Sequence, residues 1–132
     1  MTARKLVPLL AGLLVIAGCS SLPTINTLPA TFTFKFGKDV HLVDPDVIIR
    51  FAEVIQDSRC PVDVQCVQAG SALLRFSLVE PDKDLFTVIL ETGGQPYSIE
   101  GLTFRLISVD PQPHTGQFLD PAHYTATVEI TQ

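Results

Sequence analysis

The chain has 132 residues, 46% of them hydrophobic, which suits a single domain with a sizeable core. Its formal net charge of −5 at pH 7 argues against nucleic acid or anionic lipid headgroups as partners, because both require basic patches. The sequence holds three cysteines and no tryptophan.

The first residues have the layout of a secretory signal. Arg4 and Lys5 give a positive start, and an apolar run follows over residues 6–17. A membrane-spanning helix needs about 20 apolar residues, so this run is too short to cross a bilayer. We therefore expect residues 1–18 to be a signal peptide that is removed on export.

The apolar run ends in Ile16-Ala17-Gly18-Cys19, which resembles the lipobox of bacterial lipoproteins. The resemblance implies cleavage just before Cys19, a diacylglyceryl group on its thiol and a third acyl chain on its freed amine. Each buried methylene contributes about 0.8 kcal/mol, so three chains form a lasting anchor in a lipid bilayer. The alternative is an ordinary cleaved signal in which the cysteine is incidental.

Ser20 follows the lipidated position. In the Gram-negative sorting pattern that the lipobox resembles, an aspartate here retains the protein at the inner membrane, so serine predicts a lipid-anchored envelope protein at the outer membrane. Residues 19–30 are uncharged and turn-rich, and we expect a flexible tether there, followed by one domain over residues 31–132. Loss of the two basic signal residues takes the formal charge from −5 to −7.

The rest of the chain alternates between apolar strand signals and turn residues. Strands are expected at residues 31–36, 40–43, 47–55, 73–80, 85–91, 102–109 and 124–130. The segment Pro81-Asp82-Lys83-Asp84 joins two of them as a hairpin. The expected fold class is all-β: a small antiparallel β-sandwich or Greek-key barrel of about seven strands.

The segment at residues 47–55 is ambiguous, because its apolar residues also fit one face of a helix. β-branched residues are dense there and every neighbouring segment is a strand, so a strand is the preferred prediction.

Cys60 and Cys66 are the two cysteines that remain once Cys19 is lipidated. The cell envelope is oxidising, so a short-loop disulfide is the simplest prediction for them. A metal site would need further ligands, and a redox-active pair would favour the spacing Cys-x-x-Cys, which is absent here.

The sequence around these cysteines resembles a segment of many small, uncharacterised bacterial secreted proteins and lipoproteins. Their loose pattern is Phe-x-x-Val-x-x-Asp-Ser-Arg-Cys-Pro, a short gap, then Cys-[Val/Ile]-Trp-Ala-Gly. The residues that match are Phe51, Val54, Asp57, Ser58, Arg59, Cys60, Pro61, Cys66, Val67, Ala69 and Gly70. Gln68 stands where the family usually has tryptophan, and Tyr124 echoes the family's C-terminal end. The resemblance implies a β-rich fold and the cystine loop, and it transfers no activity.

Asp57, Arg59 and Gly70 are predicted to be structural residues of that loop. A carboxylate caps backbone N–H groups well, and a guanidinium can hydrogen-bond carbonyls or pair with the carboxylate. The alternative is that Arg59 presents its charge to a partner.

The catalytic search finds no nucleophile-elbow serine, phosphate-binding loop or dinucleotide fingerprint. His114 and His123 flank a loop over residues 111–121, and with Asp110 or Asp120 they are candidate metal ligands. The alternatives are solvated loop histidines, or a loop that serves as a recognition surface.

The sequence therefore favours a non-enzymatic, membrane-anchored binding or structural module that binds or supports another envelope component, with an unknown envelope protein as a possible partner. We expect no cofactor other than the covalent lipid on Cys19. The alternatives are a metal-binding envelope protein that uses His114 and His123, and an inhibitor-like lipoprotein that acts on an envelope hydrolase. An enzyme is the least favoured class.

Overall fold

The computed structural model describes residues 27–81 and 85–132. The predicted signal peptide and Cys19 lie outside these residues. The described chain forms eight strands and one short 3₁₀ turn, η1. Their bounds are β1 Ala30–Lys35, β2 Asp39–Val43, β3 Asp46–Asp57, β4 Ala72–Val79, β5 Phe86–Glu91, β6 Tyr97–Ile99, β7 Leu102–Asp110, η1 Pro121–His123 and β8 Thr125–Thr131.

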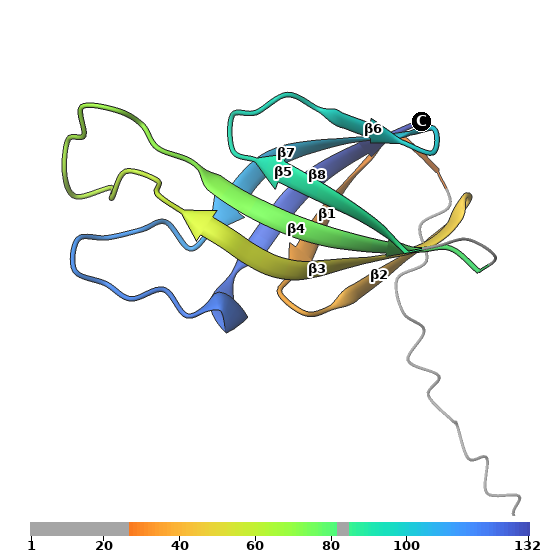
Figure 1. Ribbon diagram of the computed structural model, residues 1–132, viewed down its shortest axis with the longest axis horizontal. Coiled ribbons are helices and arrows are strands. Elements are labelled where there is room, and N and C mark those ends of the chain that lie inside the picture. The colour runs from red at the N-terminus through yellow and green to blue at the C-terminus, as the bar shows by residue number, and fades with distance from the viewer. Residues whose placement is uncertain (1–26, 82–84) are drawn as a thin grey trace, which may run out of the picture.

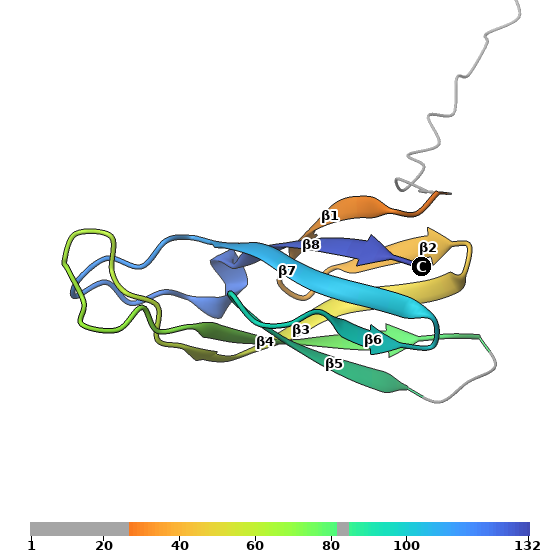
Figure 2. The same cartoon turned by 90° about the horizontal axis from the view of Figure 1, so that it is seen from above.

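The strands form two four-stranded antiparallel sheets that face each other (Figures 1 and 2). One sheet has the order β1-β8-β7-β6 and the other the order β2-β3-β4-β5. Apart from the pair of β1 with β8, each hydrogen-bonded pair joins strands that are consecutive in the chain. The sandwich prediction is therefore confirmed, with simple up-and-down connections inside each sheet.

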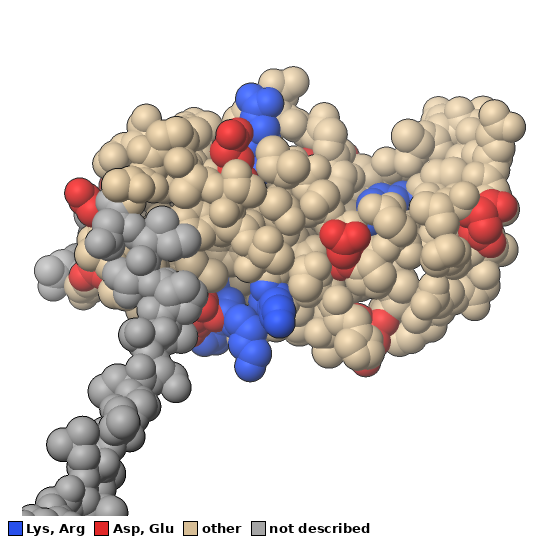
Figure 3. All heavy atoms as spheres, turned by 180° about the vertical axis from the view of Figure 1, so that it is seen from behind, with Lys and Arg blue, Asp and Glu red and all other residues tan. Residues whose placement is uncertain are grey.

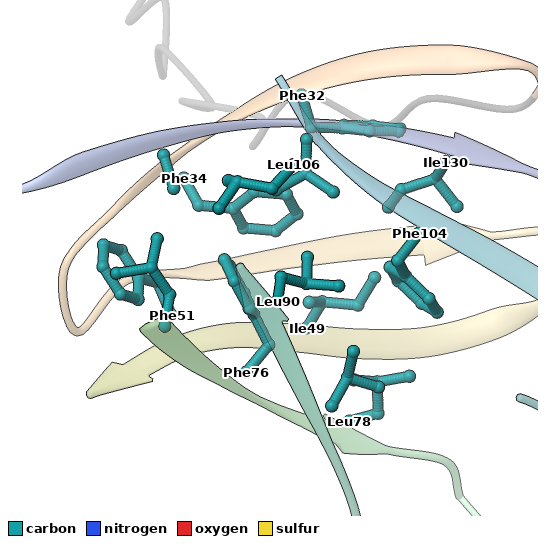
Figure 4. Close-up of a cluster of buried hydrophobic side chains, with 14 of the residues drawn as sticks. Phe32, Phe34, Ile49, Phe51, Phe76, Leu78, Leu90, Phe104, Leu106 and Ile130 are labelled. Carbon is teal, nitrogen blue, oxygen red and sulfur yellow. The ribbon is translucent and has the colours of Figure 1, made fainter. Parts of the chain in front are cut away.

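The core lies between the two sheets and comes from alternating residues of nearly every strand. Phe32 and Phe34 of β1 are buried while their neighbours face outward, as the alternation predicted. Phe34 and Phe51 both lie against Phe76, with ring centroids 5.4 Å and 5.2 Å apart, so aromatic rings from both sheets meet in the centre (Figure 4). Phe36 lies beyond the end of β1 and is only partly buried.

The ambiguous segment is a strand, as preferred. β3 pairs with β4, but the register shifts between Phe51 and Glu53 and again between Val54 and Gln56. Each bulge inserts a residue into the alternation, which explains why the apolar spacing also fitted a helical face. The predicted hairpin is confirmed as the antiparallel pair of β4 and β5.

β6 is the eighth strand, where about seven were expected. It spans three residues, Tyr97–Ile99, and only Ile99 packs against the core. Such a short strand directly after Pro96 carries no alternation to detect.

The sandwich has two distinct ends. At the loop end, the connections from β3 to β4 and from β7 to β8 project side by side in both views (Figures 1 and 2). At the opposite end, which we call the tether end, Ala30 begins β1 and pairs with Ile130 near the end of β8. Leu28 already packs against the core, so the folded domain begins slightly before residue 31.

Candidate functional site

The predicted disulfide is present at the loop end. Cys60 and Cys66 are joined by an S–S bond of 2.08 Å, with their Cα atoms 5.9 Å apart. The bond closes a small loop inside the longer connection between β3 and β4. We define the two-loop tip as residues 60–70 and 111–121, the outer parts of the two projecting connections.

Arg59 is the residue that connects the two loops. Its Nε and Nη2 lie 2.8 Å and 2.7 Å from the two carboxylate oxygens of Asp57. The remaining donors reach the other loop, because Nη1 donates to the carbonyl of Val109 at 2.6 Å and Nη2 to that of Pro111 at 2.9 Å. Both charged side chains are only 11% exposed. The structural prediction for Asp57 and Arg59 therefore agrees with these contacts, and Arg59 is not presented to solvent.

Tyr124, which lies between η1 and β8, completes the cluster. Its hydroxyl donates to Oδ2 of Asp57 at 2.7 Å. Burial and this hydrogen bond raise the pKa of Tyr124 to about 12. Burial alone would raise the pKa of the Asp57 carboxyl, but hydrogen bonds from Arg59 and Tyr124 outweigh it and hold that pKa below its ordinary value.

The backbone of the first loop packs so closely against Gly70 that a residue with a side chain would not fit there. Its φ is +54°, and a Cβ at this position would lie 1.8 Å from the carbonyl oxygen of Ser58. The two flanks of the loop are also joined by the Ser58 hydroxyl, which donates to the Ser71 carbonyl at 3.0 Å. Glycine at this position therefore lets the two flanks of the cystine loop approach each other.

Two further hydrogen bonds hold the loops together beyond Arg59. The Val62 amide donates to the Pro113 carbonyl at 3.0 Å, and the Thr115 amide donates to Oδ1 of Asp63 at 2.9 Å. The bond from Thr115 lowers the pKa of the Asp63 carboxyl. Together with the disulfide, these contacts make the tip a pre-organised unit.

The tip exposes apolar side chains to solvent. Phe118 is 86% exposed, and Val62, Val64 and Val67 of the cystine loop are exposed as well. The two tip ranges contain no lysine or arginine, and their acidic residues are Asp63 and Asp120. On the face in Figure 3, the outermost part of the loop end shows uncharged and acidic side chains.

A hollow of about 450 Å³ lies beneath the tip, between the loops and the end of β3. Apolar side chains including Ile55, Leu119 and Phe118 contribute to its lining, next to the paired Asp57 and Arg59. The hollow therefore offers an incoming group apolar surface side by side with polar groups.

The two candidate ligands His114 and His123 lie on the same connection but are not assembled into a metal site. Within residues 27–81 and 85–132, no group of three or more His, Cys, Asp or Glu side chains is arranged to hold a metal ion. Asp120 instead accepts a hydrogen bond from the amide of Ala122 at 2.9 Å, which caps η1. His114 lines the hollow beneath the tip.

Sequence reasoning assigned no role in the site to three residues that matter here: Tyr124, Asp63 and Phe118. Tyr124 and Asp57 are 67 residues apart, so no local pattern links them. Phe118 was visible as a lone aromatic residue in a loop rich in proline and polar residues, which is a signal for a recognition loop.

Comparison of the chain with protein-family models, with curated proteins and with solved structures found no match. In the part of the chain that the structure describes, no helix is long and apolar enough to cross a membrane.

Proposed function

We propose that this chain is a lipid-anchored protein of the cell envelope, held at the outer membrane by Cys19, that binds another envelope protein through its two-loop tip. The observation that supports this most is the exposed apolar tip, with Phe118 and Val67 as its most exposed side chains. It lies at the end of the sandwich opposite to Ala30, where the tether joins. An anchored chain would therefore present the tip away from its point of attachment.

The tip has the properties of a binding surface. An exposed phenylalanine on a well-held loop is the kind of residue that dominates interface energies, because its burial removes much apolar surface from water. The disulfide and the Arg59 contacts fix the loops before binding, which lowers the entropy cost of association.

The chemistry of the tip favours a protein as the partner. With no lysine or arginine in either range, the tip is poorly suited to phosphate groups or nucleic acid. Apolar side chains flanked by Asp63 and Asp120 fit a protein surface with an apolar centre and a basic rim.

Site-specific photocrosslinking in intact cells tests this proposal. A photoreactive phenylalanine analogue replaces Phe118 or Val67. The control carries the analogue at Ile107, an exposed residue of β7 outside the two tip ranges. The proposal predicts one shared protein adduct from the two tip positions and none from position 107. No adduct, or the same adducts from all three positions, would contradict it.

The captured protein is then purified and titrated with the unmodified chain. Phe118→Ser should weaken binding at least about tenfold, because truncating a central aromatic residue typically costs more than 1.4 kcal/mol. Ile107→Ser serves as the matched control and should leave the affinity unchanged.

The protruding shape of the tip also favours the narrower inhibitor-like role. Two rigid loops that project together can enter a concave cleft, and enzyme active sites are such clefts (Figure 2). If the captured partner is an envelope hydrolase, the unmodified chain should suppress its activity and the Phe118→Ser variant should not. A partner whose activity is unaffected would leave a binding role without inhibition.

A further inference from the structure

A second apolar surface lies at the tether end, on the outer face of the sheet β2-β3-β4-β5. It consists of Ile48, Val79 and Leu85, which we call the tether-end patch. Their exposed fractions are 41%, 46% and 63%. Ile48 and Val79 are register partners in β3 and β4, and all three side chains line one hollow of about 360 Å³. The patch therefore forms a continuous row across neighbouring strands.

Two exposed side-chain pairs lie beside this patch. His41 Nε2 lies 2.5 Å from Oδ1 of Asp46. Arg50 donates to both carboxylate oxygens of Asp39, at 2.6 Å and 2.9 Å. The charges of Asp39 and Arg50, which line the hollow, cancel each other, and this suits a zwitterionic surface better than an anionic one.

The position of the tether indicates what covers the patch. β2 ends at Val43, which pairs with Asp46, and β1 begins at Ala30, so patch and tether share one end of the sandwich. Residues 19–27, which precede the first residue packed on the core, span at most roughly 30 Å when fully extended. Stacked sheets are only about 10 Å apart, so this length allows the outer face to reach the membrane that holds Cys19.

We propose that the tether-end patch rests on the zwitterionic surface of the bilayer in which Cys19 is anchored, with the sandwich tilted on this end so that the two-loop tip stays clear of the bilayer. This inference depends on the lipid anchor of the proposed function. A weak contact is sufficient, because a short tether keeps the patch at an effective concentration on the order of millimolar. The apolar side chains would enter the boundary between headgroups and acyl chains.

Tryptophan fluorescence gives a direct test, because the chain has no native tryptophan. Three variants of the full lipidated protein are prepared, Leu85→Trp, Ile107→Trp and Phe118→Trp, so that each contains a single tryptophan. They are reconstituted into phosphatidylethanolamine and phosphatidylcholine vesicles, with or without brominated acyl chains that quench emission on contact. The inference predicts roughly twofold quenching for Leu85→Trp and almost none for the other two.

A further variant adds Ile48→Ser and Val79→Ser to Leu85→Trp. Loss of the apolar row should abolish most of the quenching, while flotation with the vesicles, which depends on the lipid, should persist. Far-UV circular dichroism of each variant confirms that the β-sandwich is retained.

The outcomes separate this inference from the proposed function. Failure of the unsubstituted protein to float with vesicles overturns both. Flotation with an unquenched Leu85→Trp overturns the membrane contact alone. A blue-shifted but unquenched emission that grows with protein density would indicate a second copy on the patch and would also overturn it. Equal quenching of Phe118→Trp would contradict the orientation.

Discussion

Arg59 and Asp57 are two residues apart in the chain and face each other through two parallel hydrogen bonds, from Nε to Oδ1 at 2.8 Å and from Nη2 to Oδ2 at 2.7 Å. The same guanidinium donates to two carbonyls of the other loop. A local ion pair thus positions a long-range connection, and the shape of the two-loop tip depends on it.

Replacing Arg59 with alanine should lower the free energy of unfolding by about 2–4 kcal/mol, because the poorly exposed Asp57 carboxylate loses its charged partner and the carbonyls of Val109 and Pro111 lose the guanidinium donors. Arg59→Lys should recover only part of this, since an ammonium group cannot make the two-point contact. Urea unfolding, monitored by circular dichroism, measures the unfolding free energies of both variants. Equal stability of the lysine variant and the wild type would contradict the geometric role.

Tyr124→Phe removes one hydroxyl that donates to Asp57 and keeps the buried ring. The expected loss of unfolding free energy is about 1.5–3 kcal/mol, the typical value for a hydrogen bond to a charged group. Tyr97→Phe is the matched control, because Tyr97 is the other tyrosine and is well exposed. Equal effects of the two substitutions would contradict the proposed contact.

The pH dependence of stability follows from the same cluster. The pKa of Asp57 is lowered in the folded state, so its contribution is complete above the unfolded pKa of about 3.9 and is lost as the pH falls through the folded value. Asp39 and Asp63, whose pKa values are also lowered, add to this acid loss. The pKa of Tyr124 is raised to about 12, so its contribution is complete below about pH 10 and is lost as the pH rises through about 12.

Unfolding free energies measured across the pH range should therefore form a plateau that falls on both sides. Tyr124→Phe should remove the alkaline loss that this residue causes and reduce the acid loss. An unchanged profile on the alkaline side would show that the hydroxyl is not coupled to folding.

Gly70→Ala should be more destabilising than Gly37→Ala, although both glycines have positive φ. A Cβ at Gly37 meets no atom within 4 Å, so only the backbone strain of about 1 kcal/mol applies there. A Cβ at Gly70 would overlap the Ser58 carbonyl, which raises the expected cost to about 3 kcal/mol. Thermal and urea unfolding of the two variants check this, and equal costs would rule out the close contact.

The sequence was informative wherever physical constraints act locally. Alternation along β1 identified Phe32 and Phe34 as core residues, because side chains on a strand alternate between faces. The cystine loop was predicted from two leftover cysteines and the oxidising compartment that the expected export signal implies. The bulges in β3 and the three-residue strand β6 were not predicted from the sequence, because they break or lack this alternation.

The candidate site depends on contacts between distant parts of the chain. Val62 and Pro113 join loops that are about 50 residues apart, and Arg59 reaches Val109 across the same gap. A single sequence marks the residue types but not their partners, so Asp57 and Arg59 were recognised as structural while the link to Tyr124 was not. The pairing of the two loops, which creates the tip, is a property of the folded chain.

The lipid on Cys19 is the premise for both the orientation of the tip and the membrane contact of the patch. Intact-mass spectrometry of the protein extracted from bacterial membranes tests it most directly. The account predicts a chain of residues 19–132 that carries a diacylglyceryl group and one further acyl chain on Cys19, with Cys60 and Cys66 oxidised. A chain that retains residues 1–18, or that begins at an unmodified residue, would contradict it.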